Sequence, residues 1–251
     1  MIGSASEKRY VIKIPSSFWT AFFQAVFVDI LPNLQHRRSA VVYLTLYDRA
    51  WHLPEGEVHA CLADLAKWTG LDERTVRECL VELVANGHVI RRERGQLRSR
   101  SRKPVWRVPL AEHDLNSGGP WTPVPRFLVQ SYLPRYTKAV LLLILLRLQH
   151  IHGRNECYPG AKYLTEQSGW SKRSVYEALE TMNDETDWQS VGSGLPRPLK
   201  IYWKKNRQGR LKRYLSVRAV LYNSKLRGRP EMSIDPEFKE FLGTLRPESQ
   251  R

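Results

Sequence analysis

The sequence predicts an α+β fold, mainly helical with small β-hairpins. Apolar residues recur at helical spacing in several segments, and short β-type runs follow these segments. A stretch of the chain also occurs twice, 99 residues apart. With 251 residues the chain is long enough for two modest domains, and its ordinary apolar content is sufficient for a packed core.

The repeat aligns residues 40–80 with residues 139–179 without a gap. Eleven of the 41 positions are identical, and they include Gly70/Gly169 and Val76/Val175. Segments 12–19 and 122–129 precede the two copies, and each contains an X-Pro step that we expect to lead into an apolar helix. This arrangement favours two copies of one domain over chance similarity.

The first copy begins with an expected helix over 39–51, capped by Ser39, and continues with a second over 58–68. Gly70 provides a tight turn, and Asp72 caps a third helix with Glu73 in its first turn. Apolar residues spaced i, i+4 and i+7 form one buried stripe on that helix: Val76, Leu80 and Leu83.

The first copy is completed by a C-cap at Asn86-Gly87 and two β-type runs, 88–94 and 104–110. Helix, helix, turn, helix and hairpin is the element order of a winged helix-turn-helix domain.

The second copy repeats the order. Thr137 is expected to cap its first helix, and helices over 161–168 and 171–182 flank Gly169. The hairpin spans 200–217 with Gly209 in its turn. The segment 182–198 is longer than its counterpart, and the sequence gives no physical account of it.

Two tandem winged helix-turn-helix domains are therefore predicted. The expected boundaries are 1–110 for the first domain, 111–123 for a Gly- and Pro-containing linker, 124–222 for the second domain and 223–251 for a flexible tail.

Composition indicates the cellular setting. Three cysteines without a C-x-x-C pattern are typical of reduced thiols in a cytoplasmic protein, and no secretory signal is recognisable. The most apolar stretches, 18–31 and 139–148, are shorter than the ~20 residues that span a bilayer, so we expect buried core helices and no membrane partner.

The net charge of +15 lies in two segments. Residues 89–107 carry +7 and residues 197–213 carry +8, whereas the rest of the chain has 24 basic and 24 acidic residues. Both segments coincide with the expected hairpins, or wings. A solvated basic face would explain one such segment, but two at equivalent places favour binding to the phosphates of DNA.

We expect the helices that begin after Asp72 and Ser171 to recognise the base sequence of the DNA, because their first turns would face base edges in a major groove. The candidate DNA-binding residues of the first copy are Glu73, Arg74, Thr75, Arg77, Arg91, Arg92, Arg94, Arg98, Arg100, Arg102 and Lys103. Those of the second copy are Lys172, Arg173, Ser174, Tyr176, Lys204, Lys205, Arg207, Arg210, Lys212 and Arg213.

Two of these assignments have alternatives. Arg74 and Arg173 either form two hydrogen bonds to a guanine base or form ion pairs with the glutamate four residues further along the helix. Glu73 occupies the position equivalent to Lys172 in the second copy. It either accepts a hydrogen bond from cytosine or stabilises the N-terminus of its helix through its negative charge.

Tandem winged helices, each opened by an I/V-P-x-x-F-like segment, resemble the replication initiator (Rep) proteins of plasmids and some phages. The resemblance covers residues 12 to about 222, and its motif L-x-x-x-[ST]-G-x-[SD]-x-R-[ST]-V-x-x-x-L is general to helix-turn-helix proteins. It implies binding to repeated origin sites, nucleoid or plasmid association, and contacts with host replication proteins or a second copy. Both wings here are unusually basic, and the family's dimer strand has no recognisable match.

The sequence also fits two other functions: a transcription regulator of the same fold, or a non-catalytic subunit of an RNA- or DNA-bound machine. The His150-Ile-His152 motif of rolling-circle nickases is expected at a helix end rather than on a strand, so loop histidines explain it. The Arg-Gly-Arg-Pro sequence at 227–230 matches the core of an AT-hook, but we interpret it as part of a flexible tail. A short helix is expected to begin at Asp235 within that tail. No phosphate-binding loop, zinc motif or nucleophile elbow is present, so we expect no enzyme activity, metal or cofactor.

Overall fold

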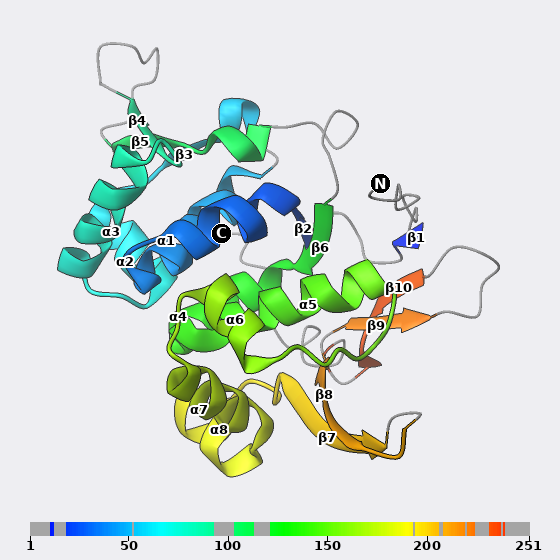
Figure 1. The fold of residues 1–251 in the computed structure, drawn as a ribbon. Coiled ribbons are helices and arrows are strands. Elements are labelled where there is room, and N and C mark those ends of the chain that lie inside the picture. Colours follow the sequence, from blue (N-terminus) through cyan, green and yellow to red (C-terminus); the bar gives the residue numbers. More distant parts are fainter. Residues whose placement is uncertain are drawn as a thin grey trace.

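The computed structural model describes residues 11–12, 19–51, 53–92, 103–112, 121–192, 194–205, 208–218, 220–223, 231–236 and 238. Helices dominate, and the strands form small sheets (Figure 1). The α+β class is therefore confirmed. We call residues 19–112 the N-terminal half and residues 121–218 the C-terminal half.

The N-terminal half begins with a strand and ends with a small sheet. Its elements are β2 (Trp19–Phe23), the π-helix η2 (Val26–Ile30), η3 (Leu31–Asn33), α1 (Arg37–Ala50), η4 (Pro54–Gly56), β3 (Glu57–His59), α2 (Leu62–Thr69), α3 (Glu73–Ala85), β4 (Ile90–Arg92), β5 (Val105–Arg107) and η6 (Pro109–Glu112). The sheet has the order β3-β5-β4 and is antiparallel.

The C-terminal half follows the same plan, with a further α-helix inserted directly before its hairpin. Its elements are β6 (Trp121–Pro125), the π-helix η7 (Leu128–Tyr132), α4 (Leu133–Arg135), η8 (Thr137–Ala139), α5 (Val140–His152), α6 (Ala161–Ser168), α7 (Lys172–Asn183), the additional α8 (Glu185–Val191), β7 (Leu199–Lys205) and β8 (Leu211–Val217). An isolated bridge places Cys157 beside Leu215 of β8. Because Cys157 is the repeat equivalent of Val58 in β3, both halves have the same sheet order.

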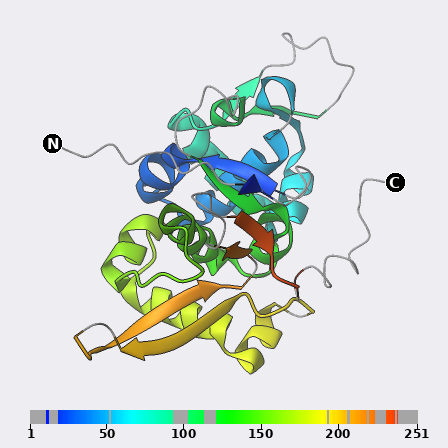
Figure 2. The ribbon, with the colours of Figure 1, turned by 90° about the vertical axis from the view of Figure 1, so that its right-hand side faces the viewer.

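A third sheet joins β1 (Val11–Ile12) to the far end of the chain. β1 runs parallel to β10 (Glu231–Ile234), which pairs antiparallel with β9 (Val220–Asn223) (Figure 2). Part of the expected tail is therefore a paired strand. Phe238 beyond it is fully buried against Phe127 and Tyr132.

The core is one contiguous cluster that runs through both halves. Each half contributes a central helix, α1 or α5, whose side chains are almost all buried. The apolar stripe predicted on the third helix is confirmed, since Val76, Leu80 and Leu83 are all buried.

Several local expectations need correction. Residues 58–68 are not one helix: Val58 is buried in β3, and α2 begins only after Cys61, where Asp64 accepts hydrogen bonds from the Cys61 N–H and thiol. Ser39 is not the cap of α1, because it lies inside the first turn and donates to Glu82. Thr137 makes no capping bond and begins the short helix η8.

The apolar stretch 18–31 is not a single core helix. From Trp19 it forms the strand β2, in which every residue is buried, followed by η2. A continuous apolar run does not distinguish a strand buried on both faces from a helix. The predicted linker 111–123 likewise ends inside a strand, because Trp121 to Pro123 belong to β6.

The unexplained insertion contains α8, which is capped by Asp184. Trp188 on this helix is fully buried, stacks on Tyr132 at 5.4 Å between ring centroids and donates through Nε1 to the Leu195 carbonyl. The insertion thus supplies an aromatic anchor to the core of its own half.

The two halves contact each other reciprocally through β2 and β6. Trp19 pairs with Pro125, and Phe23 pairs with Trp121, around a centre at Ala21. Both strands begin with Trp-Thr, so β2 and β6 are equivalent elements whose residue numbers differ by 102. After Pro32 the difference between equivalent residues falls to 99. The segment equivalent to residues 122–129 is therefore 20–27 and not 12–19.

This register is symmetric, because exchanging the two strands reproduces the same pairs. Two further contacts between the halves agree: α2 touches α4, and α6 touches η3, the equivalent of α4. An interface in which equivalent elements exchange places is that of a two-fold axis. The halves are therefore related by an approximate local two-fold axis, beside which Trp19 stacks on Trp121.

Candidate nucleic-acid interface

In the N-terminal half, α3 presents a polar face on a well-defined turn. Gly70 ends α2 at φ +68, a left-handed conformation that glycine adopts without steric cost. Asp72 then caps α3 by accepting from the Thr75 N–H at 2.8 Å, as predicted. With the apolar stripe buried, Glu73, Arg74 and Arg77 remain exposed.

The same construction recurs at α7. Gly169 has φ +68, and the Ser171 hydroxyl accepts from the Ser174 N–H at 3.2 Å. Lys172 and Arg173 are exposed in the first turn, and Tyr176 is half-buried. Figure 1 shows α3 and α7 along the same side of the molecule, one in each half.

Both first-turn arginines form the ion pair considered from sequence. Arg74 Nε lies 3.1 Å from Glu78 Oε1, and Arg173 Nε lies 2.7 Å from Glu177 Oε1. The bond from Arg173 holds the pKa of Glu177 below its usual range. These arginines are 88% and 89% exposed, and exposed pairs of this kind are weak, so either guanidinium is free to exchange its partner for a base.

Thr75 and Ser174 contribute to capping. The Thr75 hydroxyl donates to Asp72 at 2.7 Å, and the Ser174 hydroxyl lies 3.0 Å from that of Ser171. Tyr176 lies under Arg213 of β8, whose guanidinium carbon is 4.9 Å from the ring centroid. This contact ties the C-terminal hairpin to α7.

The N-terminal hairpin, formed by β4 and β5, is described only at its base. Arg92 forms ion pairs with Glu55 at 2.9 Å and Glu57 at 2.7 Å. Lys103 lies 2.8 Å from Asp64, and their hydrogen bond holds the pKa of that carboxyl well below its usual range. Arg91 is exposed. The candidate residues Arg94, Arg98, Arg100 and Arg102 lie outside the described residues.

The C-terminal hairpin, formed by β7 and β8, carries most of its described candidates on the surface. Lys204 pairs with Glu156 at 2.6 Å, and Lys212 lies over Tyr158 at 5.0 Å. Lys205 and Arg210 are also exposed, and Arg207 lies outside the described part of the chain.

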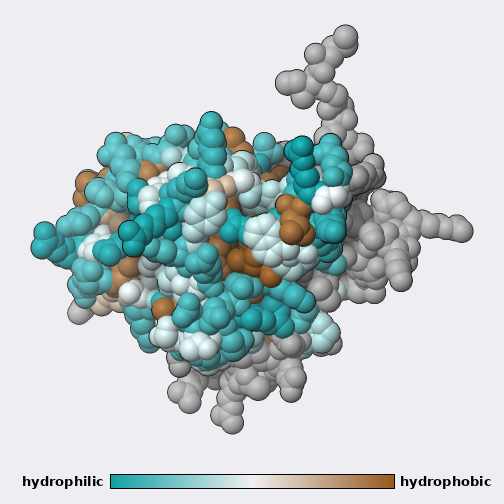
Figure 3. Space-filling model, turned by 60° about the horizontal axis from the view of Figure 1, so that its bottom comes forward, coloured by the Kyte–Doolittle hydropathy of each residue, from teal (hydrophilic) through white to brown (hydrophobic). Residues whose placement is uncertain are grey.

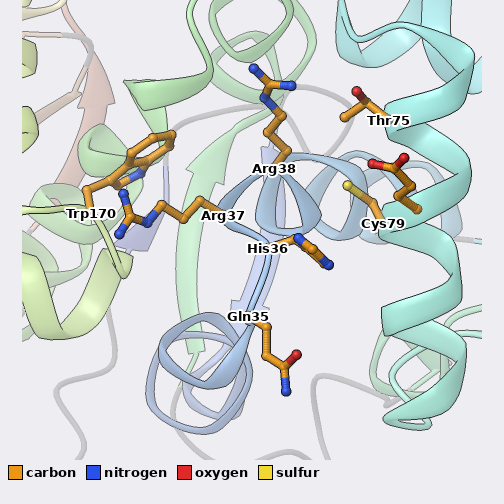
Figure 4. Close-up of a pocket in the computed structure, with 8 residues that line it drawn as sticks. Gln35, His36, Arg37, Arg38, Thr75, Cys79 and Trp170 are labelled. Carbon is orange, nitrogen blue, oxygen red and sulfur yellow. The ribbon is translucent and has the colours of Figure 1, made fainter.

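A groove of about 460 Å³ lies between α3, the beginning of α1 and Trp170. Figure 4 shows Arg37 reaching across it to Trp170, with Thr75 and Cys79 of α3 on the opposite wall. The Arg37 guanidinium carbon is 5.5 Å from the Trp170 ring centroid. Because Trp170 immediately precedes Ser171, the groove brings the approach to α7 close to the first turns of α3.

Sequence reasoning missed several exposed groups on this side. Val81 is 67% exposed and follows Arg77 by four residues, so it extends the polar face of α3 with an apolar group. Trp203 and Leu211 on the C-terminal hairpin are 64% and 62% exposed. Strand alternation in 199–205 would have revealed Trp203, because it follows Leu199 and Ile201 at a period of two.

The geometry gives no support to metal-dependent chemistry at the histidine motif. His150 is buried near the end of α5, whereas His152 is exposed, so the two side chains do not converge. Burial lowers the pKa of His150 to about 4. Among the described residues there is no group of three or more potential metal ligands.

Within the described part of the chain, no helix has the length and apolar character needed to cross a membrane. Comparison of the sequence with protein-family models and with curated proteins finds no match.

Proposed function

We propose that the protein binds double-stranded DNA sequence-specifically through two winged helix-turn-helix heads and acts as a replication initiator at origin repeats. The observation that carries the proposal is the duplicated site: α3 and α7, each with an exposed, capped first turn, lie on one side of a single chain. In each half a basic hairpin follows the reading helix.

Several features support the winged-helix assignment. Both halves have the order helix, short strand or bridge, two helices and hairpin, with the hairpin's second strand in the middle of the sheet. The two basic segments contain the entire charge excess and lie in the hairpins. Phosphate contacts there would supply affinity, while α3 and α7 would supply base contacts.

The local two-fold axis determines how the two heads would read DNA. Protein two-fold symmetry is mirrored by inverted half-sites, whereas a translated copy would read direct half-sites. The interface between β2 and β6 therefore predicts inverted half-sites within each binding site. The half-sites would differ in sequence, because Glu73 and Arg77 occupy the positions of Lys172 and Tyr176.

Selection of bound fragments from a random duplex library tests this function. Wild-type protein should enrich two unlike half-sites. Arg74→Ala and Arg173→Ala should each relax selection at one guanine, and these two guanines should lie on opposite strands. Guanines on the same strand would refute the inverted arrangement, and an absence of any enriched motif would refute sequence-specific binding.

Wing contacts are tested separately by salt dependence. Replacing Arg98, Arg100, Arg102 and Lys103 with alanine should weaken binding to every duplex and flatten the dependence of affinity on salt. The log–log slope should fall by about 0.9 for each phosphate that the wing no longer neutralises. An unchanged slope would exclude phosphate binding by this wing.

The initiator role is tested by replication. A plasmid that has only the DNA around the selected sites as its origin should be maintained when the protein is supplied and lost when it is absent. Repression of a reporter without plasmid maintenance would instead identify a transcription regulator.

A further inference from the structure

The C-terminal hairpin has an apolar face that extends beyond the body of the protein. Side chains alternate between the two faces of a strand, so Leu199, Trp203, Leu211 and Leu215 lie on one face of the β7–β8 ribbon. Leu199 and Leu215 at its base are buried, whereas Trp203 and Leu211 toward its tip are 64% and 62% exposed. Figure 2 shows the ribbon projecting from the helices.

The opposite face of the ribbon is already occupied by its own side chains. Tyr202 stacks on Tyr214 with ring centroids 6.0 Å apart, and Lys204 lies 4.9 Å from the Tyr202 centroid. The face that carries Trp203 is therefore the one left open toward its tip.

Charge identifies what covers this face. Lys205 and Arg213 lie on it with Trp203 and Leu211, and residues 197–218 contain no acidic residue. Protein interfaces bury about 800 Å² on each partner and are depleted in lysine at their centres, so an apolar pair flanked by cations suits an anionic polymer better than a protein. Figure 3 shows a mostly hydrophilic surface with only small apolar areas at this end of the molecule.

The position of the ribbon beside α7 specifies the groove. Arg213 lies against Tyr176, so the open face flanks the reading helix. With α7 in a major groove, the ribbon would lie over the adjoining minor groove. Apolar side chains that enter a minor groove part neighbouring base pairs and bend the duplex.

We propose that Trp203 and Leu211 form an apolar wedge that enters the minor groove next to the α7 half-site, unstacks one base step and bends the DNA. This inference rests on the proposed function.

The experiment uses the full chain and a duplex of the selected sequence, labelled with a dye at each end and with 2-aminopurine at the step beside the α7 half-site. Wild-type protein should shorten the end-to-end distance in energy transfer and raise 2-aminopurine fluorescence. It should bind the same duplex about tenfold more tightly when that step carries a mismatch, because a mismatch reduces the cost of unstacking.

The double variant Trp203→Ala/Leu211→Ala should lose the bend, the fluorescence change and the preference for mismatched DNA, and keep its sequence preference and salt dependence. Ile151→Ala, which removes another exposed apolar side chain at the end of α5, should behave as wild type. Equal melting temperatures for the variants would show that the hairpin remains folded.

Two results separate failure of the wedge from failure of the proposed function. Sequence-specific binding by wild-type protein without bending, or bending that the double variant retains, would overturn the wedge and leave the function intact. Absence of sequence-specific binding by wild-type protein would overturn both.

Discussion

Replacing Gly70 with alanine would test the contact between the two halves. A Cβ at Gly70 would lie 2.0 Å from the carbonyl oxygen and 2.8 Å from the carbonyl carbon of Pro134 in the other half. Because both groups are backbone, the clash is relieved only by moving α4 away from α2. Gly169, the repeat equivalent, has the same φ of +68 with no atom within 4 Å of the added Cβ.

The two glycines therefore form a matched pair. Alanine in the left-handed conformation costs about 1–2 kcal/mol at either position. At Gly70 the overpacking should add about 1–3 kcal/mol. Urea denaturation should thus show a loss of about 1–2 kcal/mol for Gly169→Ala and about 2–5 kcal/mol for Gly70→Ala. Equal losses in the two variants would refute the close packing of α2 against α4.

Asp48→Ala should destabilise the protein by about 3 kcal/mol in urea denaturation, because the buried carboxylate accepts from Thr20, Arg126 and Gln130 and joins the two halves; a loss below about 1 kcal/mol would contradict this role. For His150, burial lowers the folded-state pKa to about 4, so its stabilisation should be complete above about pH 6.5 and lost as the pH falls through about 4. The stability difference between wild type and His150→Gln should change by about 3 kcal/mol across that window, and a constant difference would exclude the burial effect. Arg173→Ala should weaken binding to the selected duplex by about 1–3 kcal/mol and to random duplexes little, whereas a uniform loss in binding assays would make Arg173 a phosphate contact.

Local signals made much of the fold predictable. Asp72 and Ser171 cap their helices through side-chain oxygens, and Gly70 and Gly169 adopt the left-handed conformation between helices. These interactions span only a few residues, so they are encoded where they act. The bounds predicted for α6, 161–168, are the observed ones.

Features that depend on distant pairing were not predictable. The strand β2 is buried because β6 pairs with it from about 100 residues away, and its apolar run alone also suits a helix. The role of α8 depends on Trp188 meeting Tyr132, a contact that no local pattern indicates. The local two-fold axis could be recognised only from the register in which β2 pairs with β6.

The candidate site was predicted in outline only. Arg74 and Arg173 lie where the helix pattern places them, but Trp170 enters the groove through the packing of one half on the other. Arg92 and Lys103 were grouped with the basic wing, yet both form ion pairs with acids distant in sequence.

Selection of bound fragments from a random duplex library at near-physiological salt tests the central claim most directly. Two heads related by the local two-fold axis predict enrichment of two unlike, inverted half-sites, about one helical turn apart. No enriched motif, together with binding that collapses as salt rises, would contradict sequence-specific recognition and leave only phosphate binding by the basic hairpins.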